Sequence, residues 1–143
     1  MINISNTYQI KYNDIENAGT VASVTKGMLK KYGFSRTFIK RVTIGLYEAE
    51  INVTIHSLGG EVTIIITDDY VDITFSDKGP GIEDITIAMI EGFSTASSMA
   101  IENGFGAGMG LPNIKSVADE MDLDSSTAGT NLRIRFYVTS NKL

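Results

Sequence analysis

Alternating hydrophobic and polar residues mark two neighbouring strands in the middle of the chain. In the segment 70–77, YVDITFSD, apolar residues face one way and the polar set that begins with Asp72 faces the other. The segment 61–68, EVTIIITD, is equally rich in β-branched residues. Asp68, at the end of this run, and Asp69 after it predict a tight hairpin turn.

Helical periodicity precedes these strands. Asp14 is a suitable N-cap for an amphipathic helix that ends at Gly33. Ser35 is expected to cap a second, longer helix, whose end is marked by Gly59 and Gly60.

The rest of the chain continues with short elements. A strand is expected at 7–12, before the helices, and a helix at 82–92 and a loop at 93–110 follow the two strands. A helix at 111–121 has Pro112 near its first position. The last element is a hairpin at 122–138 that turns at Ala128 and Gly129. This order predicts an α/β protein, an α+β two-layer sandwich with a mixed, mostly antiparallel sheet covered on one face by helices. A loop of about 18 residues inside a compact domain is commonly functional.

Composition narrows the class of protein. The 143 residues fit a single domain over 1–143, and 43% of them are hydrophobic, which is enough for a core. The formal net charge of −5 argues against a nucleic-acid-binding surface. The chain has no cysteine, no signal-peptide pattern at its start and no apolar run long enough for a membrane span, so a cytoplasmic protein is expected.

Three patches of residues suggest chemistry, and the first lies in the second helix. Glu48 and Asn52 are four residues apart, so both face the same side, where a carboxylate and an amide oxygen suit a Mg²⁺ site with an adjacent general base. The alternative is a solvated polar face, with Glu50 also exposed to water. His56 continues the stripe, and a position at the helix end favoured by the dipole explains it better than a ligand role.

The second patch, SDKGPGI at 76–82, directly follows a strand. Gly79 and Gly81 allow a sharp turn with an exposed backbone. Asp77 stands at the end of the strand, where its carboxylate can accept a hydrogen bond from an amine such as the exocyclic amine of adenine. The alternative is an ordinary turn of Asp, Gly and Pro.

The third patch is the run GFGAGMGLP at 104–112, in which glycine occupies every second position. Its spacing fits neither a P-loop nor a dinucleotide-binding fingerprint. A glycine-rich run that leads into a helix N-terminus offers free N–H groups and the positive end of the helix dipole to an anion. The alternative is a flexible hinge, and a lid that closes on phosphates would need both properties.

The order of the patches is more specific than any one of them. EAEIN, DKGPGI, a small-residue loop and GAGMGL resemble the N, G1 and G2 boxes of the GHKL (Bergerat-fold) ATPases. GFST at 92–95, GMGLPNIKSVADEM and the late GT at 129–130 are similar to the bacterial anti-sigma factor serine kinases and the related switch kinases. The resemblance covers roughly residues 8–138.

The resemblance implies a role for individual residues. Glu48 matches the catalytic glutamate, Asn52 the Mg²⁺ ligand, Asp77 the aspartate that reads adenine, and Thr130 the threonine near the base. The residues expected to bind ATP and Mg²⁺ are Asn52, Asp77, Gly79, Gly81, Ile82, Gly106, Gly108, Met109, Gly110, Leu111 and Thr130.

The resemblance implies an ATP-dependent serine/threonine protein kinase that regulates a sigma factor or another target and phosphorylates a small antagonist protein. No Lys or Arg occurs between positions 79 and 113, although relatives that transfer phosphate often carry a basic lid residue. The alternative is therefore a catalytically weak ATP/ADP-sensing binding module. Two other readings, the catalytic domain of a histidine kinase and a small domain without nucleotide, are disfavoured, the first because no dimerisation helix with a phosphoacceptor histidine precedes the domain.

The expected partners are ATP or ADP and regulatory proteins, without nucleic acid or membrane. The resemblance also implies a possible homodimer that forms through the N-terminal strand and the first helix.

Overall fold

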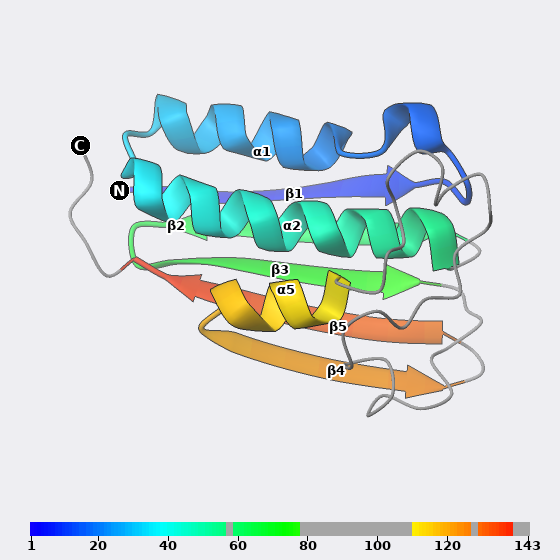
Figure 1. Ribbon diagram of the computed structural model, residues 1–143. Helices are drawn as coiled ribbons and strands as arrows, with labels where there is room; N and C mark the ends of the chain where they lie inside the picture. The colour runs from blue at the N-terminus through cyan, green and yellow to red at the C-terminus, as the bar shows by residue number, and fades with distance from the viewer. Residues whose placement is uncertain (57–58, 78–109, 127–128, 139–143) are drawn as a thin grey trace.

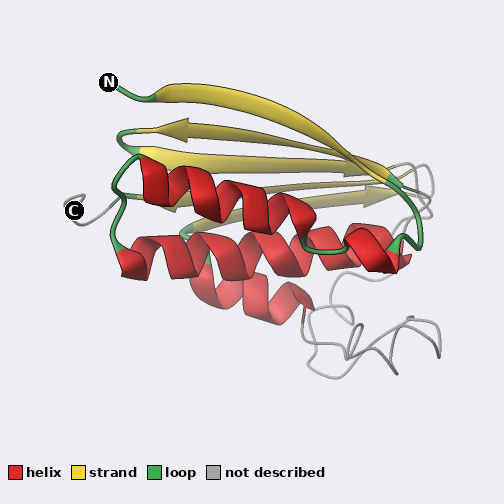
Figure 2. Cartoon of the chain, turned by 90° about the horizontal axis from the view of Figure 1, so that it is seen from above, coloured by secondary structure: helices red, strands yellow, loops and turns green. Residues whose placement is uncertain are grey.

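The computed structural model describes residues 1–56, 59–77, 110–126 and 129–138, and these form two layers (Figure 2). One layer is a five-stranded sheet in the order β1-β2-β3-β5-β4, in which every neighbouring pair is antiparallel. The strands are β1 (Asn3–Ile10), β2 (Gly60–Thr67), β3 (Tyr70–Asp77), β4 (Glu120–Ser126) and β5 (Gly129–Tyr137). The α/β two-layer architecture predicted from the sequence is confirmed.

The second layer consists of helices on one face of the sheet (Figures 1 and 2). They are α1 (Thr20–Lys31), α2 (Arg36–His56) and α5 (Gly110–Val117), and a short 3₁₀ helix at Ile15–Asn17 precedes α1. The helix α2 packs against both α1 and α5. Within the described residues, none of the helices is both long and apolar enough to cross a bilayer.

The core lies between the layers, and the predicted strand alternation creates it. Val71, Ile73 and Phe75 are buried, and the corresponding residues of β2 and β5 are buried beside them. Helix α2 approaches the sheet closely at Gly45, where an added Cβ would lie 2.7 Å from Cζ of Phe136. A side chain at this position would force either the helix or the buried ring of Phe136 to move, so the close packing favours glycine.

The first predicted helix is interrupted, which corrects the boundary read from the sequence. Asp14 makes no side-chain cap, and the chain passes through the 3₁₀ turn before α1 begins after Gly19, which has a φ of +90°. A side chain from another helix caps α1, since Glu50 accepts hydrogen bonds from the backbone N–H groups of Gly19 (3.0 Å), Val21 (3.2 Å) and Ala22 (3.0 Å). The first N–H groups of a helix have no partner within it, so this distant carboxylate supplies what a local cap would supply elsewhere.

The expectation that Glu50 is exposed to water is therefore wrong, because only 3% of its surface is accessible. Burial raises the pKa of its carboxyl, and the backbone N–H groups of residues 19–22 lower it by less. A raised pKa means that this group favours folding most below the ordinary glutamate pKa and loses that contribution as the pH rises through its folded value.

Two other element boundaries differ from those predicted from the sequence. The first strand covers Asn3–Ile10 rather than 7–12, and α5 ends at Val117 rather than 121, because β4 begins at Glu120. Arg41 binds the C-terminal end of α5. Its guanidinium donates hydrogen bonds to the carbonyl of Val117 at 3.0 and 3.2 Å and forms an ion pair with Asp119.

Several local signals are confirmed. Ser35 caps α2 by accepting a hydrogen bond from the N–H of Phe38 at 3.2 Å, and the hairpin turns at Asp68 and Asp69. The expected helix 82–92 lies outside the described residues, and so does the loop 93–110 except for Gly110, which begins α5.

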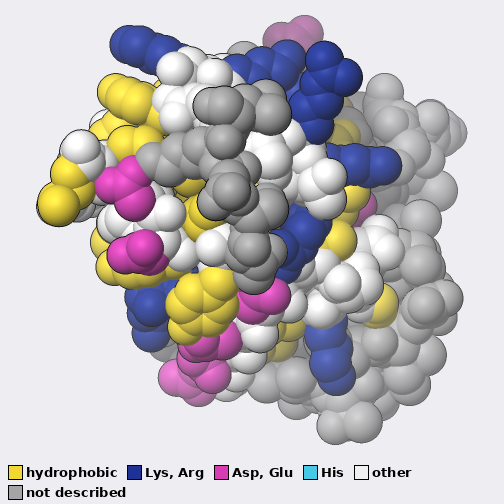
Figure 3. Space-filling view, turned by 90° about the vertical axis from the view of Figure 1, so that its left-hand side faces the viewer, with side chains coloured by type: hydrophobic (Ala, Val, Ile, Leu, Met, Phe, Trp, Pro, Cys, Tyr) yellow, Lys and Arg dark blue, Asp and Glu magenta, His cyan; other side chains and the backbone are white. Residues whose placement is uncertain are grey.

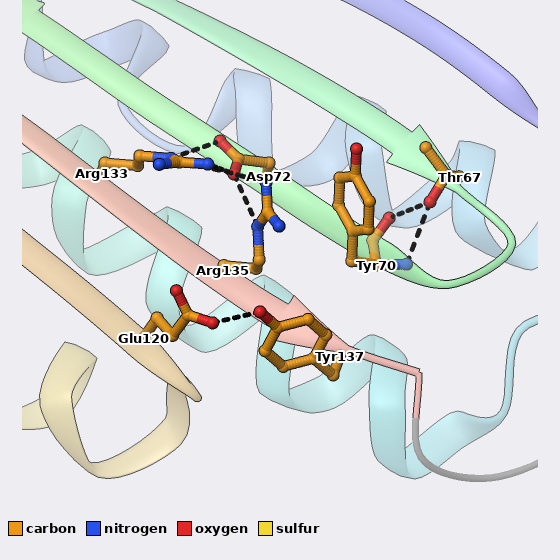
Figure 4. Close-up of polar contacts among 7 residues, drawn as sticks. All are labelled: Thr67, Tyr70, Asp72, Glu120, Arg133, Arg135 and Tyr137. Atoms are coloured by element: carbon orange, nitrogen blue, oxygen red, sulfur yellow. Dashed lines mark hydrogen bonds and ion pairs between the residues drawn. The ribbon is translucent and has the colours of Figure 1, made fainter.

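Asp72 lies on the sheet face opposite the helices, as predicted, yet it is only 4% exposed. Figure 4 shows the cause: two arginines of β5 converge on its carboxylate. Arg133 and Arg135 each donate to Oδ2 at 2.8 Å. The guanidinium of Arg135 also lies 4.0 Å from the ring centroid of Tyr70. Burial raises the pKa of Asp72, but the two arginines lower it by more, so the net shift is downward.

We expect Asp72→Asn to lower the free energy of unfolding at neutral pH by about 2 kcal/mol, the range for hydrogen bonds to a charged group. Because the folded pKa is depressed, this contribution is fully present above the ordinary aspartate pKa of about 4 and is lost as the pH falls through the folded value. Urea unfolding at several pH values measures it. The exposed Asp124→Asn is the control, and a stability difference between wild type and Asp72→Asn that does not shrink in acid would contradict the assignment.

Candidate functional site

The described candidate residues come from four elements that meet at one end of the molecule. Figure 1 shows that α2 and β3 end there, and that α5 and β5 begin there. Glu48 and Asn52 lie in the second half of α2, Asp77 ends β3, and Thr130 is the second residue of β5. Gly110 and Leu111 begin α5.

Asp77 is fixed from the neighbouring strand. The backbone N–H of Thr130 donates a hydrogen bond to Oδ1 of Asp77 at 2.9 Å, and the hydroxyl groups of Thr130 and Ser125 share a hydrogen bond at 2.8 Å. The sequence placed Asp77 and Thr130 in one site, and the structure brings them into direct contact. The bond orients the carboxylate at the end of β3.

Glycines on both neighbouring strands make room for Asp77. A Cβ on Gly129 of β5 would collide with the carbonyl oxygen of Asp77, and one on Gly60 of β2 would collide with that of Ser76. The two adjacent strands can therefore approach the end of β3 only because both positions lack a side chain. The sequence showed these glycines as turn and helix-end signals and did not connect them to Asp77.

Glu48 is tied to α5 rather than to the strands. Nδ2 of Asn113 donates to Oε1 of Glu48 at 3.3 Å, and both side chains are half-buried. Asn52, one turn further along α2, is half-buried as well. The sequence did not identify Asn113 as a site residue. The one signal for it was its position in the first turn of the helix after the glycine run.

Negatively charged side chains are close together around Glu48. The pKa of Tyr47 is raised by burial and, to a smaller extent, by the nearby carboxylates of Glu48 and Glu50. Within the described residues, no group of three or more His, Cys, Asp and Glu side chains could hold a metal by itself. The carboxylate and amide oxygens of Glu48 and Asn52 fit Mg²⁺, which needs only one or two protein ligands when it also binds phosphates and water.

The first turn of α5 is the described part of the predicted phosphate cradle. Leu111 is buried and anchors this turn in the core, while Gly110 opens the helix. The other predicted nucleotide-binding residues lie outside the described part of the chain: Gly79, Gly81, Ile82, Gly106, Gly108 and Met109. His56 is the last residue of α2.

Comparison with known proteins gives two curated relatives. The chain is 32% identical over 114 residues to the serine/threonine-protein kinase RsbT of Bacillus subtilis (strain 168), which covers 77% of this chain and 79% of that protein. It is 31% identical over 110 residues to the anti-sigma F factor of Caldanaerobacter subterraneus subsp. tengcongensis, covering 73% of each.

Solved structures share the fold at low sequence identity. The RsbU and RsbW domains of Rv1364c from Mycobacterium tuberculosis match with a TM-score of 0.62 and 16% identity; the match covers 96% of this chain and 34% of that longer one. In the SiaB-SiaC complex from Pseudomonas aeruginosa, the match has a TM-score of 0.57 and 12% identity and covers 93% of this chain and 89% of the other.

A family model matches most of the chain. The description of that model is a histidine kinase-like ATPase domain, and it matches residues 12–136. This range contains Glu48, Asn52, Asp77 and Thr130, together with the helix that begins at Gly110. The chain therefore belongs to the family of histidine kinase-like ATPase domains.

Proposed function

We propose that the protein is an ATP-binding serine/threonine protein kinase of the anti-sigma-factor type, which regulates one protein partner and phosphorylates a small antagonist protein. The observation that carries this proposal is the convergence of Asp77, held by the N–H of Thr130, with the Glu48–Asn52 stripe at one end of the fold. Membership of an ATPase family and similarity to relatives named as a protein kinase and an anti-sigma factor support it.

The proposed chemistry assigns Asp77 to adenine. Its carboxylate can only accept hydrogen bonds when ionised, so it would take one from the exocyclic amine of the base. The bond from Thr130 to Oδ1 holds the carboxylate in one orientation before the nucleotide arrives. This preorganisation would let Asp77 select adenine by its amine.

Glu48 is proposed as the general base. As the hydroxyl oxygen of a serine or threonine forms a bond to the γ-phosphorus, the bond from that phosphorus to the β,γ-bridging oxygen breaks, and ADP leaves. Glu48 would accept the proton of the hydroxyl. Mg²⁺, when bound through Asn52, would neutralise charge on the phosphates. Asn113 would keep the Glu48 carboxylate in place through its bond to Oε1.

A nucleotide sensor is the second candidate, favoured by one sequence feature. No Lys or Arg lies between positions 79 and 113, so cationic stabilisation of the transferred phosphoryl group would have to come from elsewhere. Dimerisation through the first strand and helix stays a prediction, as does the extent of the ATPase domain over 1–143.

The adenine assignment predicts that Asp77→Asn weakens ATP binding by about tenfold to a hundredfold, the loss expected for a hydrogen bond to a charged group. The amide oxygen of the variant can still accept from the N–H of Thr130, so the strand end should be preserved while the second acceptor is replaced by a donor. Isothermal titration calorimetry measures the affinity, with Asp124→Asn as the matched control. Equal affinities of Asp77→Asn and wild type would reject the assignment.

The metal assignment predicts that Asn52→Ala abolishes the gain in ATP affinity that Mg²⁺ provides. The control is Asn52→Asp, which keeps an oxygen ligand at the same place and should retain the gain. ATP titrations with Mg²⁺ and with a chelator give both values. A Mg²⁺ dependence in Asn52→Ala as large as in wild type would count against this role.

The proposed base predicts that Glu48→Gln lowers phosphate transfer to the antagonist protein by about 10²–10⁴-fold, with little change in ATP affinity. Glutamine can still accept the bond from Asn113, so this variant removes the base and keeps the contact between α2 and α5. The measurement is incubation of the protein and its co-purified partner proteins with labelled ATP, followed by phosphoprotein mass spectrometry. Undiminished transfer in the variant would refute the role of Glu48 as general base. If even wild type transfers no phosphate but binds its partner in a nucleotide-dependent way, the kinase is rejected and the nucleotide sensor is favoured.

A further inference from the structure

Positive charge is concentrated in one stretch of the chain. Residues 17–47 contain no Asp or Glu, but they contain six of the 12 basic residues, a formal charge of +6. The rest of the chain carries the other six basic residues and all 17 acidic ones, a formal charge of −11. Five of the six form what we name the basic end: Lys26, Lys30, Lys31, Arg36 and Lys40.

The fold gathers these side chains at one place. The C-terminal half of α1 and the first turns of α2 lie at the same end of the molecule (Figure 1). Lys26 and Lys30 are four residues apart on α1, as Arg36 and Lys40 are on α2, so each pair lies on one side of its helix. All five side chains of the basic end are exposed, and none pairs with a carboxylate of the described residues.

Figure 3 looks onto this end of the molecule. Lys and Arg side chains spread over the top and right of the view, and most of the Asp and Glu side chains gather at the lower left. Most of the positive charge on this end therefore lies apart from most of the negative charge, although basic atoms also lie beside the acidic group at the lower left.

Local stability explains only part of the placement of these charges. Lys30 and Lys31 stand in the last turn of α1, where the helix dipole favours cations. Arg36 is the first residue of α2, where the dipole disfavours a cation, and α2 has no acidic residue in its first turn. Like charges four residues apart also repel within each helix. The arrangement therefore costs stability that a binding role would offset.

Apolar surface accompanies the charge. Val24 and Tyr32 of the same region are 44% and 37% exposed, and Nζ of Lys31 lies 5.7 Å from the centroid of the Tyr32 ring. Exposed aromatic residues and arginine are enriched in protein-binding surfaces, and this region presents Tyr32 and Arg36.

We propose that the basic end is the docking surface for an acidic face of the protein partner. Charge complementarity identifies the partner as acidic, and two features favour protein over nucleic acid: the patch is confined to one end of two helices, and the rest of the chain, at −11, would repel an extended polyanion. The surface lies at the start of α2, while Glu48 and Asn52 lie near its end. The inference rests on the proposed function only in taking the partner to be the kinase's protein target.

The test compares two variants with the same change in net charge. Lys30→Glu/Arg36→Glu alters the basic end, and the control Lys11→Glu/Lys115→Glu alters two exposed lysines elsewhere. The probe is a fluorescein-labelled poly-L-glutamate peptide, and its binding to the full chain is followed by fluorescence anisotropy at increasing salt. A labelled DNA duplex of matched charge is the competing probe.

We expect wild type to bind the peptide with an affinity that falls with salt, Lys30→Glu/Arg36→Glu to bind at least about tenfold more weakly, and the control to stay near wild type. No binding of the peptide by wild type, equal losses in both variants, or tighter binding of the duplex than of the peptide would each overturn the proposal. Calorimetry with ATP on the same proteins distinguishes failure of this proposal from failure of the proposed function. The basic-end variant should retain the ATP affinity of wild type. Failure of wild type to bind ATP would refute the proposed function and leave the docking surface unaffected.

Discussion

The burial of one long face of α2 is the constraint on which the rest of the structure depends. The helix lies against the sheet at Gly45, where any side chain would meet the ring of Phe136. From this position α2 fixes both other helices, since Glu50 caps the start of α1 and Arg41 binds the end of α5. These two polar contacts are made across the helical layer, so the helices keep a defined placement in addition to their apolar packing.

The same placement assembles the candidate site. Because Arg41 holds the C-terminal end of α5 and buried Leu111 its beginning, Asn113 is positioned to reach Glu48. Movement of α5 along its axis would change the contact between Asn113 and Glu48. The helix that begins at the predicted phosphate cradle is thereby connected mechanically to the proposed base.

Two aspartates of β3 show how position decides what a carboxylate does. Asp72 is covered by Arg133 and Arg135 in the middle of the sheet, and its charge is used for stability. Asp77 is at the strand end, held by a backbone N–H and flanked by Gly60 and Gly129, where neighbouring side chains are absent. An arginine pair neutralises the first, while a backbone N–H orients the second at the end of its strand.

Sequence by itself determined the two layers, the hairpin at Asp68 and Asp69, the cap at Ser35 and the location of Glu48 and Asn52 one turn apart on one helix. Each follows from local periodicity, turn chemistry or the repeat of a helix. The order of its motifs also led to the correct family. Tertiary structure alone decided that Glu50 is buried, that α1 starts after Gly19 and that α5 stops at Val117, because the partners in these contacts are far apart in the chain. It also decided the roles of Gly60, Gly129 and Asn113, since close approach of strands and contact between two helices depend on register and packing that no local pattern contains.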